Sequence, residues 1–290
     1  MALHTAPKPP REPGGPSSRR NLYLWAAAGV AGVLVVGVTF FGLGGPSGGS
    51  SSLTSRPEGA AASAPASPGV VPAADQLPIS STYTTVEGAP TDTGTGPTDG
   101  TVVHPVRETP VRDAPDGTAI ARMETTQFGD TWLPVIGEQD GWVHVLLPSK
   151  PARSTGWIRS ADVTRATTPY VVTVHLRAMR LELSRNGTVT DTWRVGTGKP
   201  SAPTPAGRTF LLGAFSDSKQ KYSPVILPLG THSPTHDTFG GGPGTVAVHT
   251  WPSSDVFGTA SSDGCIRVPA DALDKLTKVP LGTLVLIDRG

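Results

Sequence analysis

The longest uninterrupted apolar stretch of the chain spans residues 22–43, where 22 consecutive positions carry no charge. As a helix it would be about 33 Å long, enough to cross a hydrocarbon core of about 30 Å. Arg19 and Arg20 precede it, and the next basic residue is Arg56. By the positive-inside rule, this asymmetry puts the N-terminus in the cytoplasm. The pattern predicts a single-pass transmembrane helix with the rest of the chain outside.

Two other interpretations of residues 22–43 stay open. A cleaved signal would release the protein, although its apolar region usually has only about 7–15 residues. The run Ser18-Arg19-Arg20-Asn21-Leu22 is a weak match to a twin-arginine signal. A buried helix of a globular domain is the third interpretation. Both the anchor and the signal place the following residues on the outer face of the membrane.

The regions on either side of this segment have little to bury. Residues 1–21 are polar, proline-rich and basic, which predicts a disordered cytoplasmic tail. Residues 44–101 are rich in Gly, Ser, Pro and Thr, which predicts a disordered linker. A flexible coil of that length has an end-to-end distance of roughly 40 Å. The folded part could therefore act at a distance from the bilayer.

Residues 102–166 show short apolar runs separated by turn residues. Asp140-Gly141 between two runs is typical of a tight hairpin turn. Several short strands in so few residues predict a small β-barrel. The expected strands are Ala119–Met123, Trp132–Ile136, Trp142–Leu147 and Gly156–Ile158.

The same region resembles a bacterial SH3-like (SH3b) module. The resemblance depends on the spacing of Trp142-Val143-His144-Val145 and Gly156-Trp157-Ile158. Such a module implies binding of a wall ligand. Trp132, Trp142 and Trp157 could be core aromatics or aromatics of a ligand groove, and the sequence leaves both interpretations open.

Residues 169–290 predict a second mainly β domain. Asn186-Gly187 between two alternating runs indicates a type I′ hairpin. The stretch Pro228–Gly244 is rich in Gly and Pro, which predicts a long loop. Apolar spacing over Ala270–Lys278 predicts one short helix. The expected strands are Tyr170–Leu176, Leu181–Arg185, Thr188–Val195, Thr209–Ala214, Thr245–His249 and Thr283–Asp288.

Composition and charge restrict the chemistry. The net charge is +1, and only 16% of residues are charged, which argues against a nucleic-acid partner because such a protein needs a basic face. The single cysteine, Cys265, excludes an intramolecular disulfide and zinc sites with two cysteine ligands. A metal site on His232 and His236 is disfavoured because no third ligand has suitable spacing. We expect neither a metal nor a cofactor.

Cys265 is the best candidate nucleophile. It follows Ser262-Asp263-Gly264, a turn-forming run that could present successive backbone N–H groups to an anion. A thiol needs a base or cation to react at neutral pH. His249 ends an expected strand sixteen residues earlier, and the intervening loop is long enough to return the chain to it. A buried, inert cysteine is the structural alternative.

Five blocks in order resemble the L,D-transpeptidase catalytic domain, also called the YkuD domain. The first is YVVTVHLRAMRLELSRNGTVTDTWRVGTGKP and the last is DALDKLTKVPLGTLVLID. The blocks between them are Thr204-Pro205-Ala206-Gly207, Val246-Ala247-Val248-His249-Thr250 and Ser262-Asp263-Gly264-Cys265-Ile266-Arg267. The fold implied is a β-sandwich with one short helix.

The resemblance implies a peptidoglycan L,D-transpeptidase that makes 3→3 cross-links through a cysteine thioester. Peptidoglycan stem peptides would be donor and acceptor, and carbapenems would acylate the enzyme. The location would be the bacterial cell membrane with the catalytic domain outside it, or the wall if residues 22–43 are cleaved. Cys265 would be the nucleophile and His249 the general base and acid. The supporting residues would be Thr250 for orientation of His249, Asp263 and Gly264 for the oxyanion hole, and Ser262 and Arg267.

The sequence departs from the family at Asp263, where a histidine is usual, and at Thr250, where many members have glycine. An inward Asp263 carboxylate would raise the pKa of Cys265. An outward one could bond the turn or Arg267, and Arg267 could instead bind a substrate carboxylate. Three other functions are alternatives: an L,D-carboxypeptidase, a degenerate wall-binding protein and a sortase-like transpeptidase. The last lacks the expected residues before the cysteine.

Overall fold

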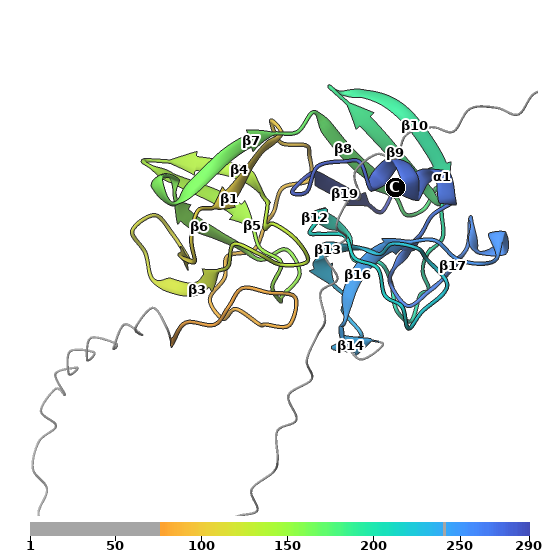
Figure 1. Cartoon of the computed structure of the whole chain (residues 1–290), viewed down its shortest axis with the longest axis horizontal. Helices are drawn as coiled ribbons and strands as arrows, with labels where there is room; N and C mark the ends of the chain where they lie inside the picture. The colour runs from red at the N-terminus through yellow and green to blue at the C-terminus, as the bar shows by residue number, and fades with distance from the viewer. Residues whose placement is uncertain (1–75, 240–241) are drawn as a thin grey trace, which may run out of the picture. The chain divides into compact units, whose positions relative to one another are not determined.

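The computed structural model describes residues 76–239 and 242–290 (Figure 1). The predicted tail, the predicted transmembrane helix and the first part of the predicted linker lie outside these residues. Everything described belongs to one compact unit, Ala66–Gly290. No helix within the described ranges has the length and apolar character needed to cross a membrane.

Residues 101–167 form a seven-stranded antiparallel sheet in the order β3-β2-β6-β5-β4-β1-β7. Asp140 and Gly141 have φ of 46° and 84°, as the predicted hairpin requires. The elements are β1 (Thr101–Pro105), β2 (Thr109–Arg112), β3 (Ala119–Met123), β4 (Leu133–Gln139), β5 (Trp142–Leu146), β6 (Thr155–Arg159), η2 (Ser160–Asp162) and β7 (Val163–Thr167).

The three tryptophans of this sheet divide between core and surface. Trp142 is buried, whereas Trp132 and Trp157 are half-buried. Trp157 stacks on His144 with ring centroids 4.4 Å apart, and Trp132 lies 5.3 Å from His104. The identity of this region as an SH3-like module stays a prediction.

The prediction of a disordered linker up to residue 101 is wrong for residues 76–101. Leu77 and Val86 are buried, and the backbone N–H groups of Val86 and Asp92 donate to the carbonyls of Lys150 and Arg153 at 2.9 and 2.8 Å. The segment has few apolar residues, but these few are inserted into the neighbouring core and its backbone is bonded to the sheet. Composition alone does not reveal such contacts, because they depend on a partner surface far away in the sequence.

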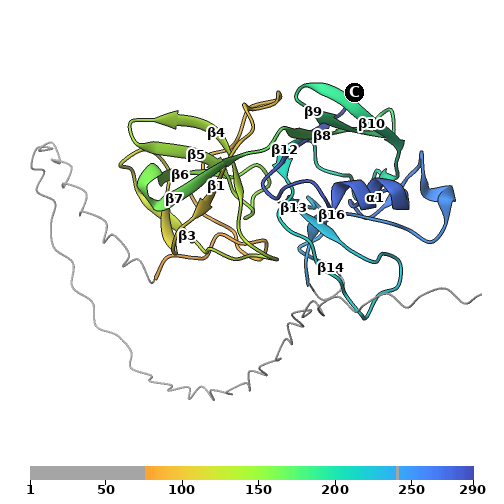
Figure 2. The same cartoon turned by 45° about the horizontal axis from the view of Figure 1, so that its top comes forward.

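The C-terminal part contains a five-stranded sheet, β10-β9-β8-β19-β12, and a three-stranded sheet, β13-β16-β18. Figure 2 shows helix α1 (Ala270–Leu276) below β8, β9 and β10 and close to β16. The larger sheet has β8 (Tyr170–His175), β9 (Arg180–Arg185), β10 (Thr188–Arg194), β12 (Gly207–Phe210) and β19 (Leu284–Asp288). The smaller has β13 (Leu227–His232), β16 (Thr245–His249) and β18 (Ile266–Arg267).

One apolar cluster unites both sheets and α1, and Ala272, Leu273 and Leu276 are the helix residues buried in it. Short elements complete the domain. These are β11 (Thr197–Gly198), which pairs with β17 (Ala260–Ser262), β14 (Thr238–Phe239), which pairs with β15 (Gly242–Pro243), and η3 (Ser254–Val256). The mainly β prediction with one short helix is confirmed.

The predicted loop Pro228–Gly244 is wrong at its start, because Leu227–His232 is the fully buried strand β13. Pro228 and Gly230 suggested a loop, yet each has a place in the strand. Its register against β16 shifts between Pro228 and His232. A Cβ on Gly230 would lie 2.2 Å from the ring of Phe210, so close packing requires glycine there. The predicted hairpin at Asn186-Gly187 is confirmed by φ values of 50° and 76°.

Candidate active site

The parallel pairing of β16 and β18 brings His249 and Cys265 together. Val248 is in register with Ile266 and His249 with Arg267. Alternate residues of a strand share a face, so Cys265, which immediately precedes β18, lies on the same face as Arg267 and His249. All three side chains line one pocket of about 150 Å³. The pairing of these two strands thus brings together His249 and Cys265, which are sixteen residues apart in the sequence.

His249 is buried and held in one tautomer. Its Nδ1 lies 2.7 Å from the carbonyl oxygen of Thr250. A carbonyl can only accept, so Nδ1 carries the proton and Nε2 keeps its lone pair. Burial lowers the pKa of His249, a tendency that the Thr250 carbonyl opposes and the positive charge of Arg267 supports. The imidazole is therefore neutral at pH 7 and able to accept a proton.

Thr250 positions His249 through its backbone rather than its side chain. Its hydroxyl donates to the carbonyl of Tyr222 at 2.9 Å, and its N–H donates to Ser223 Oγ at 3.0 Å. The Tyr222 ring lies 4.9 Å from the imidazole and 5.4 Å from Trp251. These contacts fix the strand end that carries the predicted base. The carbonyl of Thr250, and not its hydroxyl, is therefore the group that contacts His249.

The Cys265 side chain is a thiol at rest. Burial raises its pKa, a backbone hydrogen bond of Ala247 and the charge of Arg267 lower it, and the charge of Asp263 raises it further. The net direction is upward. A neutral thiol beside a neutral imidazole needs the imidazole to remove its proton during attack.

The turn that precedes Cys265 is held by the hydroxyl groups of Ser262, within the turn, and of Thr204, from a neighbouring segment. Gly264 has φ of 114°, which favours glycine. Its N–H donates to Ser262 Oγ at 3.2 Å, and that hydroxyl donates to the Cys265 carbonyl at 2.6 Å. Ser262 therefore supports the turn from within. Of the backbone donors predicted for an oxyanion hole, the N–H of Gly264 is already engaged in this way.

Thr204 connects this turn to the segment that follows β11. Its hydroxyl accepts from the Gly198 N–H at 2.9 Å and donates to the Gly264 carbonyl at 2.8 Å. Thr204 is buried. One side chain thus satisfies two backbone groups beside the nucleophile.

Replacing Thr204 with valine is expected to lower the free energy of unfolding by about 1–3 kcal/mol, because two buried backbone groups lose their partner while the shape is kept. Urea unfolding measures this. The matched control is Thr277→Val, which removes an exposed hydroxyl bonded to the Asp274 carbonyl at 3.0 Å. Equal losses in the two variants would contradict the bridging role of Thr204.

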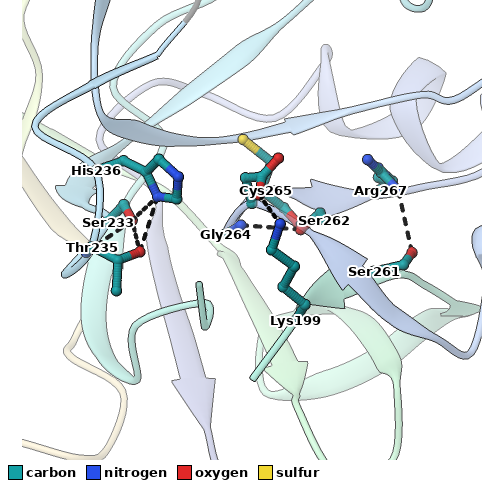
Figure 3. A network of polar contacts seen from close by, with 10 residues as sticks. Lys199, Ser233, Thr235, His236, Ser261, Ser262, Gly264, Cys265 and Arg267 are labelled. Carbon is teal, nitrogen blue, oxygen red and sulfur yellow. Dashed lines mark hydrogen bonds and ion pairs between the residues drawn. The ribbon is translucent and has the colours of Figure 1, made fainter. Parts of the chain in front are cut away.

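Asp263 takes a partner that the sequence did not suggest. Its carboxylate pairs with Lys199 Nζ at 2.5 Å. Figure 3 shows the Lys199 side chain extending toward the turn that carries Gly264 and Cys265, with His236 and Arg267 on either side. The Lys199 hydrogen bond is the main cause that lowers the pKa of Asp263, so this side chain is ionised at neutral pH. The predicted pairing with Arg267 is not what this side chain does. Its charge still acts on Cys265, but less than burial does.

Because Asp263 pairs with Lys199, Arg267 is free of an ion pair with Asp263 and lines the pocket. Its Nη1 donates to Ser261 Oγ at 3.2 Å, and its guanidinium carbon lies 4.0 Å from the centre of the Trp251 ring. Its Nε is buried and has no hydrogen-bond partner among the described residues. The guanidinium is therefore held in place with a donor still unused.

The histidine pair considered for a metal does not form a site. His232 is buried in β13 and bonded through Nε2 to the Pro148 carbonyl at 2.9 Å, whereas His236 lines the pocket of Cys265. Within the described part of the chain, no three potential ligands cluster. Pocket residues that the sequence analysis did not single out are Tyr222, Ser233 and Trp251. Tyr222 and Ser233 lie outside the sequence blocks that resemble the family, and Trp251 directly follows one of them.

Strand β16 ends at His249, and Cys265 immediately precedes β18, the parallel neighbour of β16. A base beside a thiol, with a turn held by hydroxyl groups before it, is an arrangement that can support acyl transfer. Residues 169–287 match the family model of the L,D-transpeptidase catalytic domain (YkuD). Residues 169–287 are therefore similar to that domain family, which supports the resemblance of the motifs.

The chain is also similar to solved structures. An L,D-transpeptidase from Mycobacterium smegmatis is 14% identical, with 54% of this chain and 99% of that chain covered and a TM-score of 0.34. LdtMt1 in complex with imipenem is 16% identical, with 54% and 93% covered and a TM-score of 0.35. Bd1075 from Bdellovibrio bacteriovorus is 26% identical, with 42% and 48% covered and a TM-score of 0.34. A search of curated proteins finds no match.

Proposed function

We propose that this protein is a peptidoglycan L,D-transpeptidase that forms 3→3 cross-links through a thioester on Cys265. The observation that carries the proposal is the placement of Cys265 and the single-tautomer His249 in one pocket, within a segment that matches the transpeptidase family. The donor is a stem tetrapeptide, and the bond broken joins its third residue, a diamino acid, to the terminal D-Ala.

In the first half-reaction His249 Nε2 takes the proton of Cys265, and the sulfur attacks the carbonyl carbon. The C–N bond breaks as His249 returns the proton to the departing D-Ala amine. The backbone N–H groups of Asp263 and Cys265 would face the oxyanion, and that of Gly264 would join them if Ser262 yields it. The product is a thioester and free D-Ala.

In the second half-reaction the side-chain amine of a neighbouring stem attacks the thioester. Its proton passes to His249 and then to the departing sulfur, so the C–S bond breaks and the thiol is restored. Water as the acceptor would instead make the enzyme an L,D-carboxypeptidase. Whether the amine or water reaches the thioester carbonyl first thus decides between cross-linking and hydrolysis.

Arg267 is suited to bind the carboxylate of the departing D-Ala. Its side chain is two positions beyond Cys265 on the same face, beside His249, and it holds an unused donor. Stacking on Trp251 fixes the guanidinium plane. In a tetrapeptide the terminal carboxylate is only one residue away from the scissile carbonyl. Arg267 is close enough to Cys265 to bind that carboxylate while the sulfur attacks the carbonyl.

The two other regions of the chain agree with an enzyme that acts on the outer face of the cell membrane. Residues 22–43 would anchor the chain, and the sheet of residues 101–167 would bind the wall as an SH3-like module. If the anchor is cleaved, the same enzyme would be secreted to the wall.

The test is the intact mass of the full chain after incubation with imipenem, beside the Cys265→Ala variant. We expect a stable adduct of one imipenem on the wild-type chain and none on the variant. A folded wild-type chain without an adduct would favour a degenerate wall-binding protein, an interpretation with which the raised thiol pKa of Cys265 agrees.

A further inference from the structure

The chain between Phe215 and Ile226 forms a loop that lies against His249. Phe215 and Ile226 close the loop at its base, because each donates its backbone N–H to the carbonyl of the other, at 3.0 and 2.8 Å. Within the loop, the ring of Tyr222 lies 4.9 Å from the imidazole of His249 and lines the pocket of Cys265. The conformation of this loop therefore affects the surroundings of the predicted base.

The side chain of Gln220 holds this loop in one conformation. Its Oε1 accepts hydrogen bonds from the N–H groups of Tyr222 and Ser223 at 2.9 and 3.0 Å. Its Nε2 donates to the carbonyl of Ser223 at 2.8 Å. These partners determine the orientation of the amide, since only its oxygen can accept from two N–H groups and only its nitrogen can donate to a carbonyl. One half-buried side chain thus satisfies three backbone groups that lie outside any helix or strand.

The part of the loop that Gln220 holds is bonded to Thr250 at two points. Ser223 Oγ accepts from the Thr250 N–H at 3.0 Å and donates to the Val225 carbonyl at 2.6 Å. The Tyr222 carbonyl accepts from the Thr250 hydroxyl at 2.9 Å. Ser223 is only 5% exposed, so the bonds of its hydroxyl lie away from water. The loop therefore fixes the position of Thr250.

The carbonyl of Thr250 decides which ring nitrogen of His249 carries the proton. It lies 2.7 Å from Nδ1, so the proton is on Nδ1 and the lone pair is on Nε2. A carbonyl turned away from Nδ1 would allow the other neutral tautomer, in which Nε2 carries the proton and cannot accept one from the thiol. The position of Thr250 therefore sets the fraction of molecules in which His249 can act as the base.

We propose that Gln220 is a positioning residue: by holding the loop against Thr250, its amide keeps the Thr250 carbonyl on Nδ1 of His249 and leaves Nε2 free to accept the thiol proton. This inference rests on the proposed function and adds a residue that does not touch the reacting atoms. Gln220 is not among the residues that line the pocket of Cys265. Its replacement should therefore change the rate of the reaction and not the binding of a ligand.

The first test is acylation of the full chain by imipenem at increasing concentration, for the wild type and for Gln220→Met, which keeps the length of the side chain but has no amide. We expect the maximal acylation rate to fall about 10-fold, as the loss of one hydrogen-bonded contact allows. The half-saturating concentration should change by less than about 2-fold, because the pocket keeps its lining. An unchanged maximal rate would overturn the proposal. A half-saturating concentration raised about 10-fold would also overturn it, because the loop would then be shaping the pocket.

The matched control is Gln139→Met, the same substitution at an exposed glutamine that ends strand β4. Gln139 belongs to the seven-stranded sheet and does not contribute to the lining of the Cys265 pocket. Both kinetic quantities should equal those of the wild type. A loss of rate in Gln139→Met as large as in Gln220→Met would mean that the effect is not specific to the loop.

A double variant tests the route from Gln220 to Thr250. Ser223→Ala removes the acceptor of the Thr250 N–H and should by itself slow acylation by about 10-fold. If Gln220 acts through Ser223, the double variant should be at most about 3-fold slower than the slower single variant, because contacts in one network are not additive. Single effects that multiply to about 100-fold would overturn this route.

The tautomer of His249 gives a measurement that needs no reaction. Nitrogen NMR of the full chain with isotope-labelled histidine distinguishes a protonated ring nitrogen from an unprotonated one, and the His249→Gln variant identifies the signals of His249. We expect a single Nδ1-protonated form in the wild type and a mixture of both tautomers in Gln220→Met. The same single form in both chains would overturn the proposal. Failure of the proposed function would appear separately, as a wild-type chain that imipenem does not acylate although its tautomer responds to Gln220→Met.

Discussion

Acylation of Cys265 is expected to slow by about 10²–10⁴-fold when His249 is replaced with glutamine, the usual range for loss of a general base. The reason lies in the resting charges of the pair. Burial raises the pKa of the Cys265 thiol and lowers the pKa of the His249 imidazole, so both groups are neutral at pH 7. Without the imidazole, the thiol loses the base that the pairing of β16 and β18 places beside it. The measurement is the rate of imipenem adduct formation by mass spectrometry.

The pH dependence follows from the same two shifts. A base works in its deprotonated form, and the pKa of His249 lies below the ordinary value of about 6.5. The acid limb of the wild-type acylation rate is therefore expected below about pH 6.5, with a plateau through neutrality. In His249→Gln the reaction depends on thiolate already present, so the residual rate should still climb above the usual thiol pKa of about 8.5.

The control for this experiment is His144→Gln. His144 is stacked on Trp157 in the seven-stranded sheet and is absent from the residues that line the Cys265 pocket. Its acylation rate and pH profile should match those of the wild type. A His249→Gln variant that keeps the plateau and loses less than about 10-fold in rate would mean that another group activates the thiol.

The sequence predicted β16, one of the two strands that meet at the site, but not its partner β18. β16 has the exact bounds that the sequence predicts, and the match over residues 169–287 supports the resemblance to the family. The roles of His249 and Cys265 stay predictions. Alternation of apolar side chains and the Asn186-Gly187 turn are local signals, and local signals survive in a single sequence. They identify strands without saying which strands become neighbours.

The parts that the sequence missed depend on long-range contacts. Lys199 comes to Asp263 because β11 pairs with β17, a contact between segments about sixty residues apart. Tyr222 reaches His249 through a loop of no recognisable pattern. The same applies to residues 76–101, whose composition is that of a linker and whose conformation is set by the surface to which they bind.

The free energy of unfolding is expected to fall by about 3–5 kcal/mol when Asp92 is replaced with asparagine, the usual cost of breaking a buried ion pair. Asp92 lies in the segment whose composition predicts a linker, and its carboxylate binds Arg208 of β12 at 2.5 and 2.8 Å. Their side chains are only 3% and 12% exposed. The substitution would leave the guanidinium of Arg208 buried without a countercharge. Thermal and urea unfolding of the variant and the wild type measure the loss.

The pH profile of stability tests the same ion pair by a second route. Burial alone would raise the pKa of Asp92, but hydrogen bonds from Arg208 and the Gly94 N–H, with the charges of Arg208 and Arg153, lower it overall. A carboxyl with a depressed folded-state pKa contributes stability above its unfolded value of about 3.9, and that contribution is lost as the pH falls through the folded value. The free energies of unfolding of Asp92→Asn and the wild type should therefore show their whole difference at neutral pH and become similar in acid.

The matched control removes a carboxylate from an exposed ion pair. Glu138 binds Arg165 at 2.6 Å with side chains 48% and 40% exposed, and Glu138→Gln should cost at most about 1 kcal/mol. A loss for Asp92→Asn no larger than that of Glu138→Gln would mean that residues 76–101 contribute little to the folded protein. The expected difference between the two variants would instead make this segment part of the folded unit that contains Arg208, so a chain that begins at Val102 should be less stable than one that begins at Gln76.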